Sequence, residues 1–120
     1  MKTSAKHFNY FSERVAYWQK ELGLMGWSIH LKHQKLDDKF AETHYGDESG
    51  VANIVLSTNW TDSAVSDEQL DRTALHECCH LLFSALSTEA KARYASEYDI
   101  DRAEHHIIRV IENLVTGVKR

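Results

Sequence analysis

The sequence predicts an α+β domain in which an N-terminal helix is followed by a small sheet of two or three strands and by a helical second half. Three observations predict it. Apolar residues lie alternately three and four positions apart near the N-terminus, apolar and polar residues alternate in the middle, and helical spacing returns near the C-terminus. The length of 120 residues suits one domain with a single core. We therefore expect residues 1–120 to form one domain.

The first helix is expected over residues 5–22. Ser4 can cap its start, and Gly23 can adopt the left-handed conformation just after its end. The apolar seam that would face the core consists of Phe8, Phe11, Val15, Trp18 and Leu22.

Three segments in the middle of the chain are predicted to be strands. Residues 27–32 alternate apolar and polar side chains, and residues 51–58 form the apolar run of a well-buried strand. Residues 40–45 are a weaker candidate. The segment 46–50, bounded by glycines, supplies a turn, and such short connections favour an antiparallel or mixed sheet over βαβ units.

The second half is predicted to be helical after a polar loop over residues 59–66. Ser66 followed three residues later by Gln69 has the pattern of a capping box, so a helix is expected to begin there and continue to about residue 86. A shorter helical piece would start at Ser87 or Thr88, and residues 94–99 would form a break. The last helix is expected over residues 100–118.

The first of these later helices carries an H-E-x-x-H pattern at residues 76–80. His76 and His80 would lie on one face with Cβ atoms about 5–6 Å apart, so each could place a nitrogen about 2.0–2.1 Å from one zinc ion. Glu77 would lie beside the pair, near enough to take a proton from metal-bound water. The alternative is a solvated helix face with two unrelated histidines.

The same periodicity predicts which face of this helix meets the core. An apolar stripe would consist of Leu75, Cys78, Leu82 and Ala85 or Leu86. The opposite, polar face would present Thr73, His76, Glu77, His80 and Ser84.

A third metal ligand is expected from the last helix, because catalytic zinc normally has three protein ligands. Glu104 falls within the apolar stripe of that helix, where a carboxylate is costly unless a cation or a donor meets it. We rank Glu104 first, His106 second and His105 third, with Asp101 and Glu97 behind them. The alternative for Glu104 is an ion pair at the edge of the helix packing.

The order of elements, together with the segments TALHECCHLLF and IDRAEHHIIRVIENL, resembles the minimal zincin fold. More narrowly, it is similar to the small SprT-like and ImmA/IrrE-like metallopeptidases, including short ones encoded by phages and prophages. The resemblance implies zinc ligands at His76 and His80, a catalytic acid/base at Glu77 and a third ligand at Glu104. A basic zinc-ribbon portion and a helix-turn-helix module are not recognisable, so DNA-linked and repressor-cleaving roles are not implied.

We therefore expect a zinc-dependent hydrolase, a metallopeptidase in which Glu77 is the general acid/base and an extended peptide or protein substrate lies beside a sheet edge. The alternative is a catalytically silent zincin-fold protein that holds Zn²⁺ for structure or targets a host protein. A plain interaction domain without metal is the third hypothesis. Two histidines and a carboxylate could also hold iron or manganese.

The composition of the chain argues against several other classes of protein. The net charge of −4 gives no general cationic field for direct nucleic-acid binding. The two cysteines are adjacent and cannot form a disulfide framework, and no apolar run reaches the roughly 20 residues of a membrane span. The N-terminus has no apolar signal segment. We expect a monomer in the cytoplasm, the host cytoplasm if the chain is phage-encoded.

Other residues of note have simpler expectations. Cys78 is expected in the core, and Cys79 lies at a poor angle for a metal ligand. Donors for an oxyanion could come from Tyr94, Tyr98, His44 or Tyr45, although a structural role is the default for each. Core or core-edge packing is expected for Trp18, Trp27 and Trp60, and surface positions for His7, His30 and His33.

Overall fold

The fold is α+β, as the sequence predicts. A computed structural model of the chain describes residues 1–46, 49–60, 64–92 and 94–116. Helix α1 (Ala5–Glu21) leads into strands β1 (Ser28–Gln34), β2 (Ala41–Gly46) and β3 (Val51–Ser57). Helices α2 (Asp67–Leu82), α3 (Ser84–Lys91) and α4 (Glu97–Thr116) follow. All three predicted strands and all the predicted helices are present within this part of the chain.

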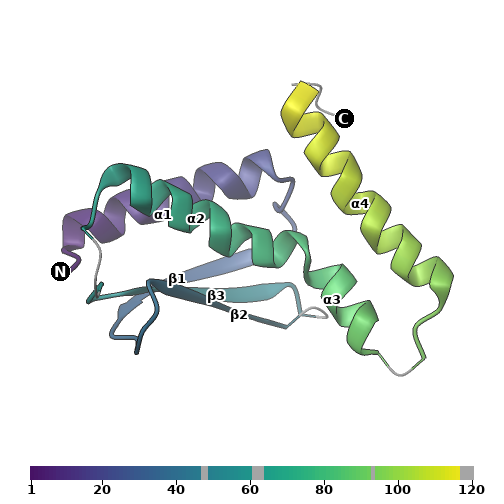
Figure 1. Cartoon of the computed structure of the whole chain (residues 1–120), viewed down its shortest axis with the longest axis horizontal. Helices are drawn as coiled ribbons and strands as arrows, with labels where there is room; N and C mark the ends of the chain where they lie inside the picture. The colour runs from purple at the N-terminus through teal and green to yellow at the C-terminus, as the bar shows by residue number, and fades with distance from the viewer. Residues whose placement is uncertain (47–48, 61–63, 93, 117–120) are drawn as a thin grey trace.

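The three strands form a mixed sheet with the order β1-β3-β2. β3 is the central strand, with β1 parallel to it on one side and β2 antiparallel on the other. Helices α1 and α2 lie side by side over one face of this sheet (Figure 1). The arrangement leaves β2 as an edge strand close to α2.

The core lies between the sheet and the two helices that cover it. β3 supplies alternate inward side chains, as expected for a strand with one face against helices. Helices α1 and α2 supply the opposing side chains, and the segment after β3 adds the fully buried Trp60. The main contributors are Ala52, Ile54, Leu56, Phe11, Val15, Leu70, Ala74 and Cys78.

Polar contacts fix the ends of α1 and join it to α2. The Ser4 hydroxyl accepts from the N–H of His7, whose ring in turn accepts from the N–H of Ser4, and Gly23 follows the helix at φ 69°. Asp71 of α2 accepts from Arg14 Nε at 2.6 Å and from Trp18 Nε1 at 2.8 Å. The predicted cap at Ser4 and turn at Gly23 are therefore confirmed.

The later helix boundaries differ from the prediction. α2 ends at Leu82, and Phe83 separates it from α3, whereas a single helix to residue 86 was expected. α4 begins at Glu97, inside the predicted break, because Ser96 and Asp99 cap each other's main-chain N–H groups. The end of the predicted last helix, residues 117–118, lies outside the described residues.

The core-facing stripe predicted for α4 consisted of Ile100, Ile107, Ile108, Ile111 and Val115, with Glu104 among them, and it is correct only in part. Ala103 and Ile107 are the buried residues of α4, and the helix packs mainly against α3. Glu104 is exposed, and so are Ile108 and Ile111, which were expected to face the core. The buried face of α4 is therefore centred on Ala103 and Ile107 and is rotated relative to the expectation.

Two further expectations concern aromatic residues. Trp60 is buried, while Trp18 and Trp27 are half-buried at the edge of the core, so their predicted packing roles are confirmed. His33 was expected at the surface, but it is half-buried, stacked on Phe8 with ring centroids 5.0 Å apart. Burial, assisted by the nearby His7, lowers the pKa of His33.

No helix in the described part of the chain is long and apolar enough to cross a membrane.

Candidate metal centre

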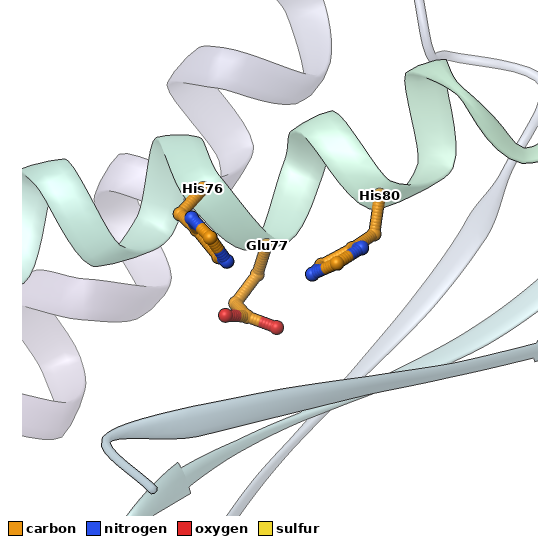
Figure 2. A group of neighbouring side chains, drawn as sticks. All are labelled: His76, Glu77 and His80. Carbon is orange, nitrogen blue, oxygen red and sulfur yellow. The ribbon is translucent and has the colours of Figure 1, made fainter.

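The candidate site is built on one face of α2. His76, Glu77 and His80 project from it toward the sheet, with the carboxylate between and below the two imidazoles (Figure 2). One ligand atom from each of the three residues lies within 4.8 Å of the others. The two imidazole centroids are 5.1 Å apart, with the ring planes at 81°. The predicted spacing therefore brings the three side chains together.

The two histidines and the glutamate differ sharply in exposure. His76 and His80 are exposed, whereas Glu77 is only 4% exposed. Glu77 was expected on a polar face away from the core, and this part of the prediction is wrong. The buried arc of α2 is wide because α1 covers one side of the helix and β2 approaches the other. Thr73 and Ser84, assigned to the same polar face, are buried as well.

Thr43 on β2 holds the carboxylate of Glu77. Its hydroxyl donates to Glu77 Oε1 at 2.7 Å and lies 3.4 Å from the Glu77 main-chain oxygen. A hydroxyl-to-carboxylate hydrogen bond of this length is charge-assisted and fixes the side chain in one orientation. The sequence reasoning missed Thr43, because the only local signal was its position in a weak strand, two residues before Tyr45.

The free edge of β2 passes beside these residues. Ser57 N–H donates to the Phe40 carbonyl at 2.8 Å, which fixes the hydrogen-bonding register of β2 against β3. In an antiparallel pair, every second residue directs its N–H and C=O to the partner and the others direct theirs away. Ala41, Thr43 and Tyr45 therefore direct their main-chain groups to the free edge.

The expected third ligands from α4 are not close to the histidine pair. Among the described residues, no further histidine, cysteine or acidic side chain joins the group of His76, Glu77 and His80. Glu104 is exposed on α4, and His106 lies near Leu81 and Leu82 on another side of α2. The predicted third ligand is therefore not assembled in this arrangement.

The remaining candidates from α4 and its approach are also accounted for. His105 is exposed, with Nδ1 2.8 Å from the Asp101 carbonyl of its own helix. Asp101 and Glu97 are exposed as well. Tyr94 and Tyr98, considered as oxyanion donors, are 86% and 67% exposed.

The two β2 candidates for an oxyanion donor have other contacts. His44 Nε2 lies 3.1 Å from Glu42 Oε1, and this contact contributes most to lowering the pKa of Glu42. Tyr45 packs edge-on against Trp27, with ring centroids 5.8 Å apart.

Both cysteines of the motif are at least partly buried, Cys78 completely and Cys79 about half. Cys78 is fully buried, and its Sγ lies 3.7 Å from the Val15 carbonyl of α1. Burial, with smaller effects of Cys79 and Glu77, raises the pKa of Cys78 to about 12. Cys79 is half-buried, and burial raises its pKa too. Cys78 is the core residue that the sequence predicts.

No protein-family model, curated protein or solved structure matches this chain. The resemblance to the zincins therefore stays a prediction, and the functional argument depends on the geometry of the His76, Glu77 and His80 group.

Proposed function

We propose that this chain is a zinc-dependent hydrolase of the peptidase kind, with Glu77 as its general acid/base. The observation that carries the proposal is the convergence of His76, Glu77 and His80, whose ligand atoms lie within 4.8 Å of one another. Exposed imidazoles beside a buried, oriented carboxylate form the arrangement that metal-assisted hydrolysis requires.

The donor set fits a zinc ion. Neutral imidazole nitrogens are among the commonest zinc ligands, and two of them four residues apart on a helix can share one ion. Zn²⁺ bound there would supply a Lewis acid and a water molecule activated near pH 7. For a third ligand we propose Glu104, ahead of His106 and His105. This requires α4 to lie differently against α2, since Glu104 is now exposed.

The protein's own groups would perform the remaining steps. Glu77 takes a proton from the attacking water and delivers it to the nitrogen that leaves. Thr43 keeps the Glu77 carboxylate in position through the 2.7 Å hydrogen bond. An extended substrate would pair with the free main-chain groups of β2 at Ala41, Thr43 and Tyr45, as in strand addition.

One observation favours a second function. Within the described residues, no further histidine, cysteine or acidic side chain joins the histidine pair and Glu77. A zinc-holding protein that cleaves nothing, acting by binding another protein, would need no complete catalytic site. The presence or absence of turnover separates this function from the first.

The test compares wild type, Glu77→Gln and the control Glu13→Gln, which changes an exposed glutamate of α1. Fluorescently labelled casein is the probe, and zinc content is measured on the same samples. We expect Glu77→Gln to keep its zinc and lose turnover by about 100-fold or more, with the control unchanged. Full activity in Glu77→Gln would refute the role of Glu77, and zinc binding without wild-type turnover would favour the second function.

A further inference from the structure

A cavity of about 390 Å³ opens directly beside the candidate site. Its wall includes His76 and Glu77 of α2, Thr73 one turn earlier, and Ala41 at the start of β2. The volume falls in the range of roughly 300–1,000 Å³ that small ligand sites occupy. Because Ala41 lines the cavity and lies on the free edge of β2, a chain extended along that edge would place a side chain in this cavity.

Two cations line the cavity. Arg72 is exposed and has no ion-pair partner among the described residues. Lys39 has a side chain that is 60% exposed, and its Nζ lies 3.3 Å from Glu42. Among the residues that the structure describes, Glu77 is the only carboxylate in the wall, and Thr43 already donates to it. The cavity thus offers two positive groups to a ligand.

This concentration of positive charge runs against the composition of the chain. The sequence has 18 acidic and 14 basic residues, so a random surface patch would be acidic on balance. A second cavity, at the other end of β2, is lined by Thr43, Tyr45, Ser87 and Lys91 and, in the described part of the chain, by no carboxylate. Apart from Glu77, both cavities along β2 are therefore free of acidic side chains within the described residues.

We propose that Lys39 and Arg72 make the cavity beside Glu77 a subsite for a carboxylate of the substrate, next to the bond that is cleaved. The chemical class of substrate is an acidic peptide or protein segment. The carboxylate could come from an aspartate or glutamate side chain or from the substrate's own C-terminus. This inference rests on the proposed hydrolase function.

The expected size of the preference for an acidic substrate follows from the exposure of Lys39 and Arg72. An exposed charge pair changes an equilibrium or rate constant by up to about fivefold, so the two cations together should favour an acidic substrate by about tenfold in kcat/KM. The preference should weaken when the ionic strength rises, because salt screens exposed charges beyond about 10 Å at 0.1 M.

The test begins with a proteome-derived peptide library, whose cleavage sites are mapped by mass spectrometry. Matched peptides are then made around the best site, with aspartate or asparagine beside the cleaved bond, each as a free acid and as a C-terminal amide. Wild type is compared with the double variant Lys39→Gln/Arg72→Gln. The control is Lys6→Gln/Arg109→Gln, which removes one exposed lysine and one exposed arginine away from the site.

Wild type and the control should cleave the peptide with the added carboxylate about tenfold faster than its neutral partner. The double variant Lys39→Gln/Arg72→Gln should cleave the acidic and the neutral peptide at rates within about twofold of each other. The variant Lys39→Glu/Arg72→Glu should instead cleave a peptide with lysine at this position faster. Comparing the free-acid and amide forms of each peptide shows whether the subsite binds a side-chain carboxylate or the C-terminal carboxylate. Cleavage by wild type without this preference, or the same preference in the double variant, would overturn the subsite alone. Absence of wild-type cleavage above the Glu77→Gln level would overturn it together with the proposed function.

Discussion

Replacing Thr43 by valine removes the donor that holds Glu77 while keeping the shape of the side chain. The Thr43 hydroxyl donates to Glu77 Oε1 at 2.7 Å, and Glu77 is 4% exposed, so water cannot freely replace the donor. Hydrogen bonds to charged groups contribute about 1.5–3 kcal/mol. We expect Thr43→Val to lower the free energy of unfolding by about this amount at pH 7.

The assay is urea unfolding of the chelator-treated chain, so that metal binding does not contribute. With a urea dependence of about 1–3 kcal/mol per molar, the midpoint should fall by roughly 1 M. Thr43→Ser keeps the hydroxyl and loses one methyl group, so it should cost only about 1 kcal/mol. Thr88→Val, at an exposed position of α3, is the matched control and should change stability by less than about 0.5 kcal/mol.

A double-mutant cycle of Thr43→Val and Glu77→Gln isolates the contact between the two side chains. We expect a coupling energy of about 1 kcal/mol or more, because the two residues touch directly. In the labelled-casein assay, Thr43→Val should lower kcat about tenfold with little change in KM, and Thr43→Ser should restore most of it. Zero coupling, together with the same kcat in all three Thr43 forms, would refute the positioning role of Thr43.

The remaining predictions concern the packing that supports α2. Asp71→Asn should lower the free energy of unfolding by about 1–2 kcal/mol at pH 7, because Asp71 accepts from Arg14 and Trp18. Burial opposes ionisation, but the two hydrogen bonds outweigh it and lower the pKa of Asp71. The stabilisation is therefore complete above the unfolded pKa of about 3.9 and is lost as the pH falls through the lower folded value. Urea midpoints whose difference does not shrink in acid would contradict this. Cys78, fully buried with its pKa raised to about 12, should react with iodoacetamide at pH 8 only after unfolding. Mass spectrometry of the alkylated peptide checks this, and rapid alkylation in native buffer would contradict it.

Local signals in the sequence predict most of the elements. The first helix, its cap at Ser4 and the three strands follow from short-range spacing and turn residues, and they lie within about two residues of the prediction. The start of α2 at the Ser66 cap is also local, since the Ser66 hydroxyl accepts from Gln69 N–H at 3.2 Å. The convergence of His76, Glu77 and His80 needs only a helix, which is why the motif alone predicts it.

What the sequence does not predict depends on contacts between distant elements. The burial of Glu77 follows from the approach of β2, and the hydrogen bond from Thr43 spans 34 positions of the chain. The orientation of α4 was predicted from its isoleucines, and Ile107 is buried as expected, but Glu104 and Ile108 are exposed. When apolar residues cover more than one face of a helix, the sequence does not determine which of them face the core until the element that packs against the helix is known.

Zinc stoichiometry tests the central claim, that His76 and His80 hold a metal ion beside Glu77. After zinc-replete growth and dialysis, wild type and Glu77→Gln should carry about one zinc per chain, and His76→Ala and His80→Ala less than about 0.1. The same measurement on Glu104→Ala, His105→Ala and His106→Ala tests the proposed third ligand from α4. Less than about 0.1 zinc per wild-type chain, or unchanged zinc in both histidine variants, would contradict the account.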